Sequence, residues 1–191
     1  MSNSKGSALI FTLMVILILT VLGVSILELS LTEFKISASY GNDVLSRYAA
    51  EAGLDILKSE FNTNLLTALK NNAQRIIDNN YDMEKGTYKV SMDQLYSLIF
   101  NDTKNYLYSY VFNKYLNEGN VALGNTGQIY NISNITFTQD EGMQYIIHIE
   151  TVGIYRNIKS YGHADLILNL QATGNPITIS NWTIDNIPPS N

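Results

Sequence analysis

Residues 7–27 read SALIFTLMVILILTVLGVSIL, contain no charged side chain, and directly follow Lys5-Gly6. At about 1.5 Å per residue, a helix of this length reaches about 30 Å, the thickness of a bilayer's hydrocarbon core. The segment therefore predicts a protein at a membrane, with the rest of the chain on one side of it. It argues against a soluble cytoplasmic enzyme.

Three interpretations of this apolar segment compete. A cleaved secretory signal has an apolar region of roughly 7–15 residues, which is shorter than this one. An uncleaved signal anchor fits the length, and so does a short leader that is cut just before the apolar helix. Lys5 and the α-amino group are the only positive charges ahead of the segment, and they favour an N-terminus on the cytoplasmic side.

The helical pattern continues beyond residue 27. Apolar positions follow at alternating spacings of four and three, a period of 3.5 residues that is typical of helices packed against other helices. This helix-packing seam comprises Leu27, Leu31, Phe34, Ala38, Leu45, Tyr48 and Ala52, with Gly41 in register. No proline lies between residues 7 and 61, so we expect one helix of about 80 Å. A simple anchor needs no such extension, whereas a bundle of N-terminal helices does.

Two short motifs carry a family resemblance. The first is Lys5-Gly6 followed by Ser7-Ala8-Leu9-Ile10, and the second is the run YAAEAGL at residues 48–54. Over residues 1–60 the chain resembles type IV minor pilins and pseudopilins of the PilX-like group. A weaker echo of the paired C-terminal strands of pilins lies at residues 152–156 and 164–168. The resemblance implies cleavage between Gly6 and Ser7 by a prepilin peptidase, N-methylation of Ser7, and transfer from the membrane into a helical filament.

The resemblance also implies the partners of this chain. The sequence departs from the family pattern at one position. Expected partners are other pilin subunits through the N-terminal helix, the prepilin peptidase, the pilus assembly platform and, before assembly, membrane lipid. Major pilins usually have glutamate at the fifth position after the cleavage point, where it pairs with a neighbour's N-terminal amine. Here that position is Phe11. Because buried charges in lipid need partners, Phe11 argues against the bulk filament subunit.

The fold class expected is α+β and pilin-like: a long N-terminal helix packed on an antiparallel β-sheet, with a helical insertion. We divide the chain into a leader (1–6), a transmembrane or filament-core half of the helix (7–27), its amphipathic half (28–61), a helical insertion (62–122) and a sheet region (123–191). Within these regions we predict helices at 62–80 and 92–118, and strands at 128–139, 143–155, 158–171 and 177–183. Hairpin turns are expected at 140–142 and 156–157.

Candidate chemistry is sparse. His148 and His163 show no spacing that links them into a metal motif, so we expect structural or surface roles. Asp82 with Glu84, and Asp140 with Glu141, are interpreted as solvated turns rather than calcium ligands. Four Asn-x-Ser/Thr triplets are attributed to the high asparagine content. Tyr106, Tyr108, Tyr110 and Tyr115 crowd one helix, and tyrosine suits interfaces. We expect no cofactor, no metal and no catalytic residues.

Composition narrows the function further. The net charge of −5 with scattered basic residues gives no electrostatic footprint for nucleic acid, and the absence of cysteine excludes disulfides and thiolate chemistry. Two function classes remain. The first is a minor pilin or pseudopilin that initiates or caps a filament, and the second is a single-pass anchored extracellular adhesin that never polymerises. In both, the N-terminus is cytoplasmic and the domain lies outside. An enzyme is not expected.

Overall fold

The computed structural model describes residues 4–187, with side chains from residue 7. It divides into two compact units, an N-terminal unit up to Asn42 and a C-terminal unit from Asp43, and each is described by itself. Helix α1 (Ser4–Glu60) contributes to both. The expected unbroken helix over residues 7–59 is confirmed, while residues 1–3 of the expected leader lie outside the described residues.

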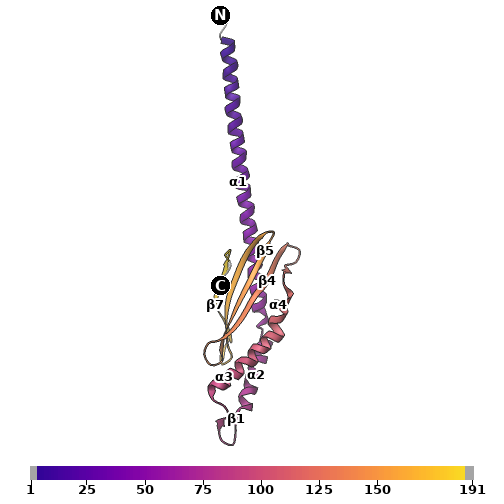
Figure 1. Cartoon of the computed structure of the whole chain (residues 1–191), viewed down its shortest axis with the longest axis vertical. Helices are drawn as coiled ribbons and strands as arrows, with labels where there is room; N and C mark the ends of the chain where they lie inside the picture. Colours follow the sequence, from indigo (N-terminus) through magenta and orange to yellow (C-terminus); the bar gives the residue numbers. More distant parts are fainter. Residues whose placement is uncertain (1–3, 188–191) are drawn as a thin grey trace. The chain divides into compact units, whose positions relative to one another are not determined.

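A five-stranded sheet forms one layer of the C-terminal unit (Figure 1). All neighbouring strands are antiparallel, in the order β3 (Val121–Ala122), β4 (Gln128–Gln139), β5 (Gln144–Tyr155), β6 (Ile158–Asn169) and β7 (Ile177–Asp185). The four long strands begin and end within two residues of their expected bounds. Gly142 and Arg156 take positive φ angles of 56° and 53° at the two expected hairpin turns. Val121 and Ala122, expected in the helical insertion, pair with β4 instead.

The two faces of this sheet differ. Along β5 and β6, every second side chain is buried and its neighbours are half-buried. The buried side chains join α1 residues such as Leu54 and Leu57 in one apolar core. Each leucine buried in this way stabilises the fold by about 1.5–3 kcal/mol. The predicted packing of the amphipathic helix on the sheet is therefore confirmed for residues 43–60.

Small residues let α1 approach the sheet very closely. Ala49 and Ala50 are fully buried, and a Cβ added to Gly153 of β5 would overlap the backbone of Ser46 and Ala50. Polar side chains bridge the same contact: Thr151 Oγ1 donates to the Ala50 carbonyl at 2.8 Å, and the Ser46 and Ser160 hydroxyls lie 2.6 Å apart. The YAAEAGL run therefore serves close helix–sheet packing.

The insertion between α1 and the sheet is helical, as expected. It contains α2 (Thr63–Asn79), a hairpin of β1 (Tyr81–Asp82) and β2 (Thr87–Tyr88), α3 (Met92–Leu107), the π-helical turn η1 (Tyr108–Phe112) and α4 (Asn113–Glu118). Asn62 caps α2 by accepting from the Asn64 and Leu65 amides, and Ser91 forms a capping box with Gln94 at α3.

The insertion shares its core with the sheet. The Phe100 ring of α3 stacks on Phe137 of β4 at 5.3 Å and lies 5.7 Å from the Tyr145 ring of β5. Tyr115 of α4 donates a hydrogen bond to Glu60 near the end of α1. The expected α+β architecture is thus confirmed, with the insertion and the sheet in one compact unit.

Candidate functional site

The first candidate site is the exposed apolar surface of the N-terminal unit. Every side chain from residue 7 to residue 37 is exposed, including large apolar ones such as Phe11 (70%) and Phe34 (71%). Among the described residues, one helix is long and apolar enough to cross a membrane by length and composition, and it is α1. A surface of this kind requires lipid or other helices around it.

Three hydroxyl groups within this apolar segment are satisfied internally. Thr12, Thr20 and Ser25 each donate to the carbonyl four residues earlier, at 2.8, 2.8 and 2.9 Å. In a bilayer core, an unsatisfied hydroxyl costs several kcal/mol, on the order of a lost hydrogen bond in an apolar medium. These three hydroxyls therefore present no unsatisfied donor to lipid or to an apolar filament core.

The expected processing residues lie at the start of α1. Gly6 and Ser7 both fall within the helix, and Ser7 is exposed. Phe11 lies one turn further along, with its side chain pointing to solvent rather than into a core. Cleavage after Gly6, methylation of Ser7 and the effect of Phe11 remain predictions.

The expected helix-packing seam does not coincide with the face of α1 that contacts the sheet. In the N-terminal unit, Leu27, Leu31 and Phe34 are 65%, 58% and 71% exposed. In the C-terminal unit, Tyr48 is 58% exposed, and Leu45 and Ala52 are half-buried. The fully buried positions are instead Ser46, Ala49, Ala50, Leu54 and Leu57. Contacts of the seam with other subunits remain a prediction.

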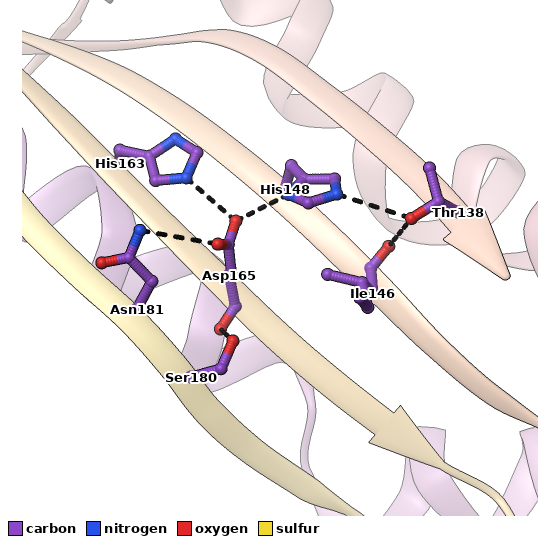
Figure 2. A network of polar contacts seen from close by, with 7 residues as sticks. All are labelled: Thr138, Ile146, His148, His163, Asp165, Ser180 and Asn181. Carbon is purple, nitrogen blue, oxygen red and sulfur yellow. Dashed lines mark hydrogen bonds and ion pairs between the residues drawn. The ribbon is translucent and has the colours of Figure 1, made fainter. Parts of the chain in front are cut away.

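The second candidate site is a polar cluster on the half-buried face of the sheet, which we call the His–Asp cluster: His148, His163 and Asp165. Figure 2 shows both imidazole rings directed at one carboxylate oxygen. His148 Nδ1 lies 2.6 Å and His163 Nε2 2.9 Å from Asp165 Oδ1. Asn181 of β7 approaches the other oxygen, Oδ2, at 3.5 Å.

Strand geometry produces this convergence. Asp165 lies directly opposite His148 in the β5–β6 register, and His163 precedes Asp165 by two residues on the same face. On the other side, the β6–β7 register shifts between Asp165 and Leu166. This irregularity places Ser180 and Asn181 beside Asp165, and bulges of this type are frequent next to functional sites.

The electrostatics of the cluster favour an ionised carboxylate. Partial burial by itself raises the pKa of Asp165, but the hydrogen bond from His148 and the charges of His163 and His148 outweigh it, with a smaller contribution from Asn181. The net effect holds the pKa of Asp165 below its usual value. The three side chains keep 20–35% of their surface exposed, so solvent and small ions reach them.

Sequence spacing links the two histidines into no metal motif, but the cross-strand register brings them together at Asp165. The expected turn at residues 156–157 was sufficient to find this pairing, because counting outward from the turn along both strands places Asp165 opposite His148. The other acidic candidates behave as turns. Asp82 accepts from the Glu84 and Lys85 amides, and Asp140 accepts from the Gln144 side chain.

The tyrosines of α3, η1 and α4 divide between two faces. Tyr106 and Tyr110 pack together with ring centroids 4.6 Å apart, and Tyr110 is 72% exposed. Tyr108 donates to the Ile135 carbonyl of β4 at 2.8 Å, and Tyr115 is buried. Tyr108 and Tyr115 therefore hold the insertion to the core, whereas in the other pair Tyr106 is half-buried and Tyr110 is exposed.

Comparison with known proteins gives one family match. Residues 5–55 match the family model described as PilX N-terminal. The comparisons with curated proteins and with solved structures find no match. The resemblance to PilX-like type IV minor pilins that the sequence predicts is thus confirmed over most of α1. Over these residues the chain is similar to that family, whose members are structural pilins, and the apolar helix agrees with a membrane-anchored pilus component.

Proposed function

We propose that this chain is a minor pilin, a structural subunit of a type IV pilus or a related secretion filament. It is cut between Gly6 and Ser7 by a prepilin peptidase, N-methylated at Ser7, and passed by the pilus assembly platform from membrane lipid into the filament. The N-terminus is cytoplasmic and the C-terminal unit lies outside. The observation that carries this proposal is the unburied apolar surface over residues 7–37 within a helix that matches the PilX N-terminal family.

Physical chemistry supports two successive environments for that surface. Burying a Leu, Ile or Phe side chain is worth about 1.5–3 kcal/mol, and this segment exposes more than a dozen large apolar side chains. Membrane lipid buries these side chains before assembly. Helices of neighbouring subunits satisfy them afterwards, and the seam of period 3.5 supplies the packing pattern.

Cleavage is tested by Gly6→Leu in cells that assemble the filament. We expect loss of processing with unchanged membrane insertion, because a bulky side chain at the polar edge of the segment obstructs the peptidase. Gly23→Leu is the matched control: Gly23 lies in the same helix with open space around it, so processing should continue. Equal processing of the Gly6→Leu and native chains would contradict the proposal.

The position in the filament follows from Phe11. A subunit without a carboxylate at this position cannot neutralise the amine of a neighbour, although its own Ser7 amine still requires a partner. One subunit at an end accommodates this deficit more easily than every subunit along the shaft. We therefore place this chain in filament initiation or at the tip, in low copy number.

Quantitative proteomics of sheared filaments tests this position. Phe11→Glu should raise incorporation along the shaft or disturb initiation, whereas the uncharged control Phe11→Leu should leave the copy number unchanged. If the native chain were as abundant as the major subunit, the tip position would be wrong. Recovery of the chain from the membrane alone, never from filaments, would favour the anchored adhesin instead.

A further inference from the structure

We propose that His148, His163 and Asp165 form a binding site for a divalent transition-metal ion, with zinc the best match. The inference is independent of the role in a filament, because it rests on the sheet alone. The donor atoms His148 Nδ1, His163 Nε2 and one Asp165 oxygen all lie within 4.8 Å of one another. The three side chains come from two adjacent strands of a regular sheet, so their spacing is set by backbone register rather than by a loop.

The donor set identifies the class of ion. Two imidazole nitrogens and one carboxylate oxygen are typical of Zn²⁺ sites that keep an open position, whereas Ca²⁺ and Mg²⁺ prefer oxygen ligands alone. Zinc binds nitrogen and oxygen at about 2.0–2.2 Å, which separates tetrahedral donors by roughly 3.3 Å. The present gaps of 2.6 and 2.9 Å to Asp165 Oδ1 therefore need to widen by about half an ångström. Side chains that keep 20–35% of their surface exposed have the room to do so.

The surroundings orient the ligands. His148 Nε2 faces Thr138 Oγ1 at 3.4 Å, and Asn181 approaches Asp165 Oδ2. In a metal site the second nitrogen of a ligating histidine carries the proton and donates a hydrogen bond to an outer partner. Here Thr138 would accept that hydrogen bond. Figure 2 shows this arrangement, with Thr138 and Asn181 at opposite ends of the cluster.

An open coordination position has space beside it. A surface hollow of about 320 Å³ adjoins His163, and its lining includes the carboxylates Glu150 and Asp185. These negative groups favour approach of a cation. Water would fill the remaining position, and each imidazole would bind as the neutral ring, with its proton on the nitrogen that faces away from the ion.

The test uses the full chain in detergent micelles, purified through a tag without histidine and stripped with a chelator that is then removed. Zinc chloride is titrated by calorimetry, and the imidazole signals are followed by NMR. Because the chain contains only two histidines, the spectrum reports directly on the proposed ligands. We expect one zinc per chain, shifts of both imidazoles, and no comparable response to calcium.

Variants decide whether the cluster is responsible. Asp165→Asn and His163→Gln should each weaken zinc binding by more than the 10–100-fold typical of losing an outer partner, and Thr138→Val by about tenfold. Asp140→Asn, the same chemical change at a turn outside the cluster, should have no effect. Circular dichroism melts verify that each variant folds. If Asp165→Asn does not fold, His163→Gln alone tests the site.

Four results would overturn the proposal, three of them concerning zinc alone. The first is absence of zinc binding at millimolar concentration. The second is binding that survives both Asp165→Asn and His163→Gln, and the third is binding that Asp140→Asn weakens equally. A calcium response equal to that of zinc would also contradict it, because imidazole ligands do not select a hard cation.

Discussion

Gly153 of strand β5 lies directly against the backbone of Ala50 in helix α1, with no space for a Cβ between them. On the helix side, Ala49 and Ala50 are fully buried, and a Cβ on Gly53 would meet Tyr130 at 3.0 Å. Helix and strand therefore touch through their main chains, which requires the smallest side chains on both. This contact orients the C-terminal half of α1 on the sheet.

Gly153→Ala should be strongly destabilising. The added methyl group meets helix backbone, which cannot rotate away as a flexible side chain would, so we expect a loss of about 3 kcal/mol or more, at the upper end for overpacking. Chemical unfolding of the full chain in detergent, followed by near-UV circular dichroism, measures it. Gly174→Ala, at a site with no neighbour within 4 Å, is the control and should be nearly neutral. Equal stability of the two variants would contradict the close contact.

The two faces of α1 should separate stability from assembly. Leu57 is fully buried, so Leu57→Ala should cost about 2–5 kcal/mol in the same unfolding measurement. Tyr48 belongs to the seam and is 58% exposed, so Tyr48→Ala should change the unfolding free energy by no more than about 0.5 kcal/mol. If the seam contacts other subunits, Tyr48→Ala should instead reduce recovery in sheared filaments. A large loss of stability from Tyr48→Ala would show that the faces are assigned wrongly.

Tyr145 should make the fold sensitive to alkali. Its hydroxyl is buried with no hydrogen-bond partner among the described residues. Burial outweighs the opposing effect of Thr103 on the Tyr145 pKa. Burial raises the pKa of Tyr145 to about 12, above the value of about 10 in an unfolded chain. The folded state therefore holds this proton more tightly. Its contribution is fully present below pH 10 and is lost as the pH rises through 12.

Tyr145→Phe removes both the orphan hydroxyl and this titration. Because an unsatisfied buried hydroxyl costs about 1–3 kcal/mol, we expect the variant to be at least as stable as the native chain at pH 7. Between pH 10 and 12 its unfolding free energy should fall less than that of the native chain. The difference between the two isolates Tyr145 from the other twelve tyrosines. Parallel pH profiles would contradict the buried, unpaired hydroxyl.

Local patterns were sufficient for most of the secondary structure. Strand β4 has the bounds expected from its β-branched residues, and α2 begins at Thr63, one residue after the expected start. These features depend on neighbouring residues and were therefore visible in the sequence. The π-helical turn at Tyr108–Phe112 was not visible. It lies where Tyr108 reaches β4 and Phe112 enters the core, and those contacts are tertiary.

The sequence predicted neither the sheet-facing side of α1 nor the His–Asp cluster, and the two reasons differ. Hydrophobic periodicity identifies positions occupied by large apolar residues. The positions of α1 nearest the sheet are instead Ser46, Ala49 and Ala50, where small size matters more than hydrophobicity. The cluster required the β5–β6 register to be followed from the turn at Arg156 to Asp165. Residues far apart in sequence, such as His148 and Asp165, become neighbours only through that register.

The central claim, that this chain is a processed filament subunit, is tested most directly by peptide mass spectrometry of its N-terminus in sheared surface filaments. We predict an N-terminal peptide beginning at Ser7 and carrying an N-methyl group. A peptide that begins at Met1 in assembled material, or absence of the chain from filaments while it is abundant in the membrane, would contradict the claim.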